Sequence, residues 1–368
     1  MKNLSHLGFN SQKSFGRPLL KGYDRDRALS FMDPFLLDTV KIQYSKSLRR
    51  LKDKTQVISG LGNVNIRDRM IHSFEVMSAS VQSGARLGLN ISLLQASALG
   101  HDLGHVPFGH LGERFLAEKL GEKFRHEKFA IFVLEMVERD GVGLNLSYET
   151  LQAIANHSRG GGKMITKKGE ILEDDVIMFC DKMSYIFSDY NDICRIGYNG
   201  FVLPDEMLKL GSNQTERLTR CLQAFWKESI KKQDISFAES QEAQWFQKVR
   251  DFMYEEVYYK MDRLEDRANM KGMLNKVYSF FVEYFGDSRQ AALALSLSSE
   301  ADVYALVCLL EQYGLAIVNS RIVDTKTFSI AELLPKIPGW AELDFCDPSR
   351  FMDKKNFGKV SKLECFAR

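Results

Sequence analysis

HDLGHVPFGHLGE, residues 101–113, is the most informative stretch of this sequence. Its adjacent His101 and Asp102 offer an imidazole and a carboxylate, a mixed nitrogen and oxygen donor set that suits several divalent metal ions. Two neighbouring residues cannot complete a coordination sphere, so further ligands must come from elsewhere. His72, at the head of an apolar-patterned helix, and Asp181, directly after an apolar run, are the candidates. Two histidines and two aspartates would leave about two positions of an octahedral ion open, as hydrolysis requires.

The histidines of the chain are concentrated around this stretch. The 368 residues include seven histidines, and five of them lie between positions 72 and 126. An even distribution would place roughly one histidine in a window of that length. Such an excess indicates a metal site or catalysis, and composition alone does not distinguish the two.

The rest of the motif suits acid–base chemistry. His105 follows His101 by four residues, so both would project from one face of a helix. The proline and glycine that come next would break this helix and turn His110 back toward the same cavity. Glu113 would hydrogen-bond the His110 imidazole if a new helix begins there, which fixes the tautomer and raises the basicity of the ring.

Apolar spacing predicts helices along nearly the whole chain. The chain has only seven prolines and no series of alternating apolar and polar runs. Residues 91–105 are expected to form a buried central helix that ends near Pro107. Other helices are expected at 124–139, 148–157, 174–190, 205–210, 214–232, within 240–285, and at 300–320. Residues 163–172 are typical of one short β-hairpin, so the expected fold class is all-α with this single exception.

Two further segments are expected to be structural. The Gly-rich basic loop that follows His157 is typical of a surface excursion more than of a phosphate-binding loop. The aromatic-rich stretch 252–259 is expected to lie in the core or at a subunit interface rather than to stack on a base.

Charge and composition limit location and partners. The first 60 residues hold 12 Lys and Arg against 5 Asp and Glu, so this basic segment could bind nucleic acid weakly, although a solvated basic face is as common. No 18-residue apolar window is present, the N-terminal residues lack the apolar region of a secretory signal, and the six cysteines form no CxxC pair. We therefore expect a cytoplasmic protein without a membrane partner.

The order H…HD…D resembles the HD superfamily of metal-dependent phosphohydrolases. More narrowly, HDLGHVPFGHLGE resembles the HDxGHxPFGHxGE block of the deoxynucleoside triphosphate (dNTP) triphosphohydrolases, the dGTPase-like family. Further blocks agree in order and spacing: RRL at 49–51 followed by KTQV at 54–57, RDRMIHS at 67–73, GLNLS at 143–147, and the DxxxYxxxD arrangement at 181–189. The resemblance covers roughly residues 20–200, about half of the chain.

This resemblance implies an HD-type helical phosphohydrolase core with peripheral helices. Metal-activated water would attack the α-phosphorus of a dNTP and release a deoxynucleoside and tripolyphosphate. One divalent ion per site, for which Mn, Mg, Fe, Ni and Zn are not distinguished, would have four ligands: His72, His101, Asp102 and Asp181. The catalytic groups would be His105, His110, Glu113 and His126. Substrate contacts would come from Arg50, Gln56, Arg69, Lys182, Tyr185 and Asp189.

The resemblance also leaves open points. Glu127 stands where the family usually has Asn, which puts the role of the preceding His126 in doubt. Family members assemble, so a homo-oligomer and a dNTP activator are expected. Residues 1–200 are expected to form the catalytic core with its basic N-terminal segment. Residues 201–368 would form a helical region packed on the core, or the two would form one continuous domain.

Two other functions stay open at this point. One is another HD phosphohydrolase, acting on a nucleoside monophosphate or a signalling nucleotide, although the chain lacks the HDxxED continuation and the GYP motif of enzymes that act on signalling nucleotides. The other is a nucleotide-sensing or nucleic-acid-binding regulator on the same fold. Because all four ligand positions are filled, the site itself gives no support to a loss of catalysis.

Overall fold

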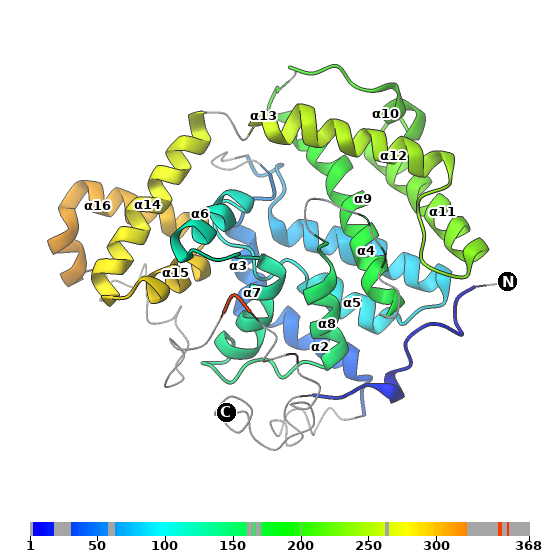
Figure 1. Ribbon diagram of the computed structural model, residues 1–368, viewed down its shortest axis with the longest axis horizontal. Coiled ribbons are helices and arrows are strands. Elements are labelled where there is room, and N and C mark those ends of the chain that lie inside the picture. Colours follow the sequence, from blue (N-terminus) through cyan, green and yellow to red (C-terminus); the bar gives the residue numbers. More distant parts are fainter. Residues whose placement is uncertain are drawn as a thin grey trace.

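The computed structural model describes residues 3–17, 31–57, 63–159, 171–198, 200–261 and 265–321, together with residues 164, 166, 345–347 and 352. These residues form an assembly of helices, which confirms the predicted all-α class (Figure 1). Within these ranges the only β pairing is an isolated antiparallel bridge between Thr55 and Asp68. The hairpin expected at 163–172 falls mostly outside the described residues.

The described residues up to position 195 form eight α-helices. They are α2 (Pro34–Gln43), α3 (Lys46–Arg50), α4 (Arg69–Leu87), α5 (Ile91–Gly100), α6 (His110–Leu120), α7 (His126–Phe132), α8 (Tyr148–Asn156) and α9 (Leu172–Arg195). A π-helical turn, Val133–Val137, continues α7, and short 3-10 turns lie at Ser11–Lys13 and Leu51–Asp53.

The second half continues in the same manner. Its helices are α10 (Asp205–Leu210), α11 (Gln214–Lys232), α12 (Gln241–Phe252), α13 (Tyr259–Met261), α14 (Glu265–Phe285), α15 (Ser288–Leu297) and α16 (Glu300–Arg321). A π-helical segment, Met253–Tyr258, joins α12 to α13, and α16 is kinked at Gly314. The bounds expected for α10 and α11 are confirmed, whereas the stretch expected within 240–285 is divided among several helices.

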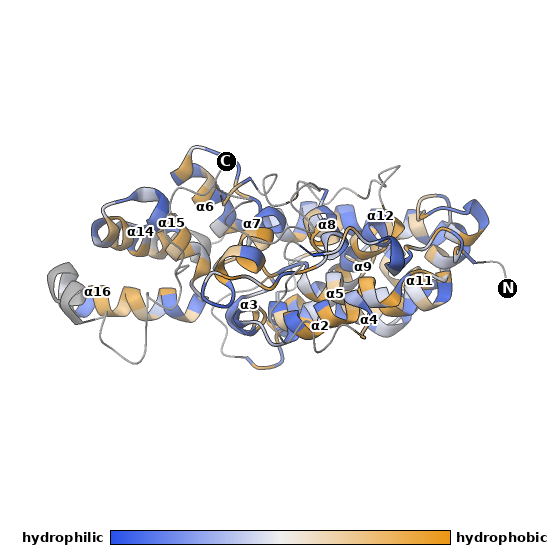
Figure 2. Cartoon of the chain, turned by 90° about the horizontal axis from the view of Figure 1, so that it is seen from below, coloured by the Kyte–Doolittle hydropathy of each residue, from blue (hydrophilic) through white to orange (hydrophobic). Residues whose placement is uncertain are grey.

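Helices α4, α5 and α9 pack together in the middle of the molecule (Figure 1). Local sequence sets where α4 and α5 begin, because the Asp68 side chain caps the first turn of α4 and Asn90 caps α5. Gly88 ends α4 in the left-handed conformation, at φ 79°. Seen from below, the helices form a flat arrangement, with α14–α16 at one end and α11 and α12 at the other (Figure 2).

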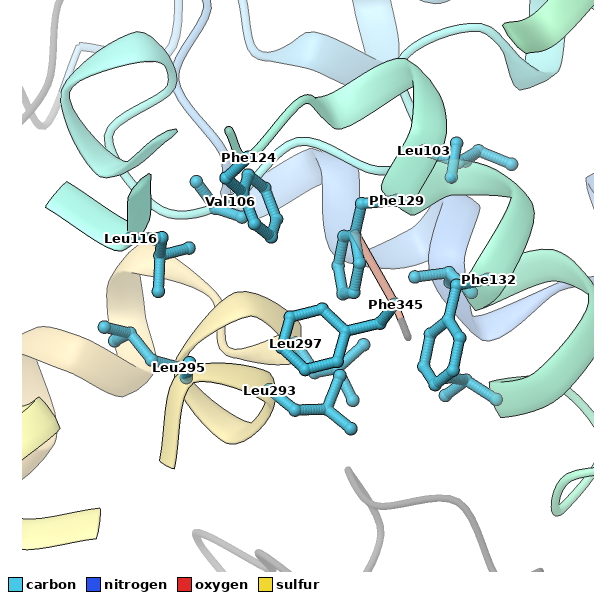
Figure 3. Packing of buried hydrophobic residues seen from close by; sticks show 14 of the residues in the cluster. Leu103, Val106, Leu116, Phe124, Phe129, Phe132, Leu293, Leu295, Leu297 and Phe345 are labelled. Atoms are coloured by element: carbon cyan, nitrogen blue, oxygen red, sulfur yellow. The ribbon is translucent and has the colours of Figure 1, made fainter. Parts of the chain in front are cut away.

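Two hydrophobic clusters fill the interior. One joins α6, α7 and α8 to α14, α15 and α16, and the other joins α4 and α9 to α10, α11 and α12. In the first cluster Phe345 lies against Phe129 and Phe132, with ring centroids 6.0 and 5.9 Å away, while the leucines of α15 face the same core (Figure 3). Each cluster draws on residues before and after position 200. The domain boundary at 200 stays a prediction.

The central helix is shorter than expected. Helix α5 ends at Gly100, and residues 101–104 form a turn in which the His105 N–H donates to the Asp102 carbonyl at 3.0 Å. The interpretation of His101 and His105 as two positions on one helix is therefore wrong. The physical reason is the approach of α7: a Cβ atom on Gly104 would lie 2.0 Å from the His126 carbonyl oxygen and 2.4 Å from the Ala130 nitrogen.

A Gly104→Ala substitution should therefore destabilise the protein strongly. The added methyl meets backbone rather than a flexible side chain, so we expect the free energy of unfolding to fall by about 3 kcal/mol, measured by urea denaturation. Gly272→Ala on α14 is the matched control, because no atom lies near its Cβ position and alanine favours a helix. Equal stability of the two variants would contradict the proposed close contact.

Some basic residues of the N-terminal segment form hydrogen bonds and ion pairs inside the fold. Arg17 pairs with the buried Asp38, and the Lys41 Nζ donates to the Asn145 carbonyl at 2.9 Å. The buried Lys54 donates to the His105 carbonyl. Among the described residues, each helix is too short or too polar to cross a membrane.

Candidate active site

The structure brings the four predicted metal ligands together. His72 lies on α4, His101 and Asp102 lie at the end of α5, and Asp181 lies on α9. The His72 Nε2 atom is 3.0 Å from the Asp181 Oδ1 atom, and the His101 Nε2 atom is 3.4 Å from Asp102 Oδ1 and 3.8 Å from Asp181 Oδ1. Ligand atoms bound at about 2.1 Å around one ion lie roughly 3 to 4 Å apart, so the spacing of His72, His101 and Asp181 fits a shared cation. Asp102 lies at the edge of this group, with Oδ2 4.0 Å from His72 Nε2, and also groups with His105 and His126.

The protonation states of His101, Asp102 and Asp181 also suit the binding of a cation. The His101 Nδ1–H donates to the Ala98 carbonyl at 2.6 Å, so the lone pair of this ring is on Nε2, a buried atom for which the structure shows no hydrogen-bond partner. Burial opposes the ionisation of Asp181, but the Lys182 ammonium and His72 hold its pKa well below the usual range. His101, His105 and Arg69 overcome burial in the same way and lower the pKa of Asp102.

A second group of side chains is centred on Glu113. As expected, α6 begins at His110, and the His110 Nδ1 atom lies 3.2 Å from Glu113 Oε2. The other carboxylate oxygen is 2.6 Å from His126 Nδ1, and the His126 ring stacks on His105 with centroids 3.7 Å apart. The His105 Nε2 atom is 3.2 Å from Asp102 Oδ1, which connects this group to the metal ligands. The structure therefore brings the four predicted catalytic residues together.

One cavity of about 470 Å³ is lined by members of both groups: His72, Asp102 and Asp181 of the first, and His105, His110, Glu113 and His126 of the second. Of the predicted substrate contacts, five line this cavity: Gln56, Arg69, Lys182, Tyr185 and Asp189. Arg50 does not line it and instead lies near the carboxylates of Glu138 and Asp302, so its phosphate role stays a prediction. Arg114 and Arg125 line the cavity as well, which adds two cations that the sequence pattern does not reveal.

Comparison with known proteins identifies the family. The HD domain family model matches residues 69–186, the span that holds the four candidate ligands. A Clostridium tetani protein named deoxyguanosinetriphosphate triphosphohydrolase-like protein is 34% identical over 283 residues, which cover 75% of this chain and 79% of the relative. A protein of the same name from Caldanaerobacter subterraneus subsp. tengcongensis is 32% identical over 326 residues, covering 83% and 91%. This chain belongs to the deoxyguanosinetriphosphate triphosphohydrolase-like family. It is a metal-dependent phosphohydrolase of the HD type, as the resemblance implies.

His157 is a residue of this HD site that the sequence pattern does not reveal. Its Nδ1–H donates to the Ile154 carbonyl at 2.7 Å, its Nε2 atom is 3.2 Å from His126 Nε2, and its ring lies 5.0 Å from the His101 ring. His157 follows the last residue of α8 just as His101 follows that of α5, a likeness that only the structure shows.

These contacts determine the protonation state of His126. Because His157 uses its one proton on the Ile154 carbonyl, its Nε2 lone pair accepts the Nε2–H of His126. Burial alone would lower the pKa of His126, but the Glu113 carboxylate raises it to about 9. His126 is therefore an imidazolium at neutral pH, whereas burial keeps the pKa of His157 well below its usual value.

Glu127, which replaces the usual Asn of the dGTPase-like family, lies beside this imidazolium. Its buried carboxylate is 3.6 Å from His126 Nδ1 and pairs with Arg125. Glu127 therefore places a carboxylate near His126. Both residues line the cavity, so His126 belongs to the site although the usual Asn does not follow it.

The aromatic-rich stretch packs in the core, as expected, through Met253 and Val257, and its tyrosines also line the site. Tyr254 and Tyr258, on the π-helical segment, and Tyr259 border the cavity. The Tyr254 hydroxyl is 2.9 Å from the Tyr185 hydroxyl, and the Tyr258 hydroxyl donates to Asp189 at 2.8 Å. The four-residue spacing of Tyr254 and Tyr258 is equally typical of a core helix, so the sequence alone does not place them in the site.

Proposed function

We propose that this protein hydrolyses dNTPs to a deoxynucleoside and tripolyphosphate. The observation that carries the proposal is the composition of the single cavity of about 470 Å³, which is within the range of small-molecule sites. Its lining combines three of the four candidate metal ligands, His72, Asp102 and Asp181, with basic and tyrosine side chains: Arg69, Arg114, Arg125, Lys182, Tyr185, Tyr254, Tyr258 and Tyr259. The fourth candidate, His101, lies buried behind them. Cations suit a triphosphate, and aromatic rings suit a nucleoside. The names of the relatives support the same substrate class.

We assign the metal to His72, His101, Asp102 and Asp181. A divalent ion held there would supply Lewis-acid polarisation of the α-phosphate and a lowered pKa for water. Arg69 and Lys182 are placed to hold phosphate oxygens beside it, since Arg69 Nη1 is 2.9 Å from Asp102 Oδ2 and Lys182 Nζ is 3.6 Å from Asp181 Oδ2.

We assign the proton for the leaving 5′-oxygen to His110. Its side chain is 68% exposed and borders the cavity, whereas His105 and His126 are buried. Glu113 accepts the Nδ1–H of His110, which orients the ring so that a proton carried on the opposite nitrogen, Nε2, would be delivered to the leaving 5′-oxygen. One water is consumed as its oxygen bonds to the α-phosphorus, the bond from that phosphorus to the 5′-oxygen breaks, and the 5′-oxygen leaves with a proton.

Asp189 is the candidate for binding the deoxyribose 3′-hydroxyl. Its Oδ2 atom accepts from Tyr258, and its Oδ1 atom is 2.6 Å from Arg67 Nη2, which fixes the orientation of the carboxylate. The neighbouring ring of Tyr185, held at its hydroxyl by Tyr254, would pack against the sugar or the base.

A product assay tests the proposal. Purified protein is incubated with Mn²⁺ or Mg²⁺ and each of the four dNTPs, with the matching ribonucleotides in parallel, and the products are separated by chromatography. Deoxynucleoside together with tripolyphosphate is the expected result. Release of orthophosphate or pyrophosphate alone, or turnover of a nucleoside monophosphate only, would contradict it.

Several properties expected from the sequence or from the resemblance stay predictions. These are homo-oligomer assembly, activation by a dNTP, weak nucleic-acid binding by the basic N-terminal segment, and a cytoplasmic location. The identity of the metal is also open, because the two-histidine, two-aspartate set suits several divalent ions.

A further inference from the structure

Glu300, in the first turn of α16, connects the C-terminal helices to two segments that form walls of the cavity. Its buried carboxylate accepts three hydrogen bonds, from the Thr55 N–H at 2.9 Å, the Thr55 hydroxyl at 2.6 Å and the Phe108 N–H at 3.0 Å. Thr55 and Phe108 both line the cavity, and Glu300 itself does not. One carboxylate therefore sets the distance between two walls that are 53 residues apart in the sequence.

The Phe108 segment is held in an unfavourable backbone conformation. Phe108 has φ 60°, a region that bulky residues rarely adopt, and Gly109 follows at φ 54°. His110 comes next, at the first position of α6, so the direction of its side chain depends on these two residues. Glu300 binds the Phe108 N–H directly, and the ring of Tyr304 packs edge-on against the Phe108 ring with centroids 5.8 Å apart.

The Thr55 segment also contacts the substrate side of the cavity. The Lys54 carbonyl accepts from the Arg69 N–H at 2.9 Å, and the Gln56 carbonyl faces Arg69 Nη2 at 3.4 Å. Thr55, between them, is bound through both its N–H and its hydroxyl to Glu300. Movement of this segment would displace Gln56 and Arg69, two proposed substrate contacts.

The position of Glu300 is itself fixed. The Ser299 N–H donates to the Asp302 carboxylate at 2.7 Å, and the Asp302 N–H donates to the Ser299 hydroxyl at 3.1 Å. This reciprocal pair is a capping box, which holds the first turn of α16 in place. The carboxylate is thus presented by a fixed helix end and not by a mobile loop.

We propose that Glu300 is a positioning residue for catalysis, which holds the loop before His110 and the segment that carries Gln56 in their reactive arrangement. The effect on turnover rests on the proposed function, whereas the effect on the two segments does not. No chemistry is assigned to Glu300 itself.

The experiment compares Glu300→Ala, Glu300→Gln and the control Glu311→Ala. Glu311 is an exposed carboxylate on the same helix that pairs with Lys276 and is not among the residues that line the cavity. Amide hydrogen exchange of the metal-free protein is followed in peptides covering 51–57 and 105–111. We expect Glu300→Ala to raise exchange there about ten-fold or more, with α4 and α9 unchanged, and Glu311→Ala to have no such effect.

Turnover provides the second readout. With Mn²⁺ and dGTP, we expect kcat of Glu300→Ala to fall about ten-fold or more, because small displacements of a positioned group are costly. Glu300→Gln should recover most of this loss, since its amide oxygen still accepts from both N–H groups and its NH₂ can donate to the Thr55 hydroxyl. A purely structural role would lower the unfolding temperature of both variants without this rescue.

The outcomes separate the two ideas. Local exchange equal to that of Glu311→Ala would overturn the positioning role. Raised local exchange in a protein whose wild type hydrolyses no dNTP would support the positioning role and contradict the proposed function. Should Glu300→Ala not fold, Thr55→Val, which removes only the hydroxyl bond, must raise exchange in 51–57, and unchanged exchange would overturn the inference.

Discussion

Asp102→Ala is expected to abolish both divalent metal binding and turnover. Asp102 is the candidate ligand that also contacts Arg69 at 2.9 Å and His105 at 3.2 Å, so its loss removes an anionic ligand and leaves a buried guanidinium without its partner. We expect kcat to fall at least about a thousand-fold, the equivalent of roughly 4 kcal/mol of transition-state stabilisation. Bound Mn²⁺, measured by elemental analysis after gel filtration, should fall to background.

A control separates metal loss from unfolding. Asp192 is also buried on α9 and pairs with Arg67 and Arg195, but it does not line the cavity. Asp192→Ala should lower the stability of the protein and still retain the metal. Retention of metal and turnover by a helical Asp102→Ala protein would show that the ligand assignment is wrong.

Much of the metal cluster could be predicted because its signals are local. His101 and Asp102 are neighbours, and the motif HDLGHVPFGHLGE places Glu113 one helical turn after His110. Helix bounds were predicted well where caps and periodicity agree, as in α11, which the Asn213 side chain caps.

The end of α5 could not be predicted because its cause is not local. The apolar pattern continues through residue 105, yet the helix ends at Gly100 since the following turn passes against the backbone of α7. Gly104 permits this contact, and nothing in the neighbouring sequence shows which segment lies there.

The residues missed in the site share long-range partners. Tyr258 meets Asp189 across 69 residues of chain, and Glu300 meets Phe108 across 192. Such contacts arise only when several helices have packed, so no pattern in one segment reveals them. At 252–259 the sequence predicts the core contacts but not the tyrosines that also border the cavity, because tyrosines in the two environments have the same spacing.

Glu113→Gln is expected to lower kcat about a hundred-fold while the fold is retained. The variant keeps the shape of the side chain but removes the charge that both His110 and His126 face, at 3.2 and 2.6 Å. His110 then loses the carboxylate that fixes its tautomer, and His126 loses the main group that raises its pKa to about 9. Glu118→Gln is the control, because Glu118 lies on the same helix, is exposed and pairs with the exposed Lys271.

Glu113→Gln should also lower the stability of the protein, and this loss should be larger at low pH than at high pH. The pKa of His126 rises from an ordinary 6.5 to about 9 on folding, so its stabilising contribution is complete below about pH 6.5 and disappears as the pH rises through 9. In metal-free protein, the free energy of unfolding of the wild type should exceed that of Glu113→Gln by about 2 kcal/mol at pH 5.5 to 6.5. The difference should decline toward pH 9.5, measured by urea denaturation at each pH. If the difference in free energy of unfolding between the two proteins does not vary with pH, then His126 is not a charged imidazolium held by Glu113. His110, the proposed general acid, would in that case act without an imidazolium beside it.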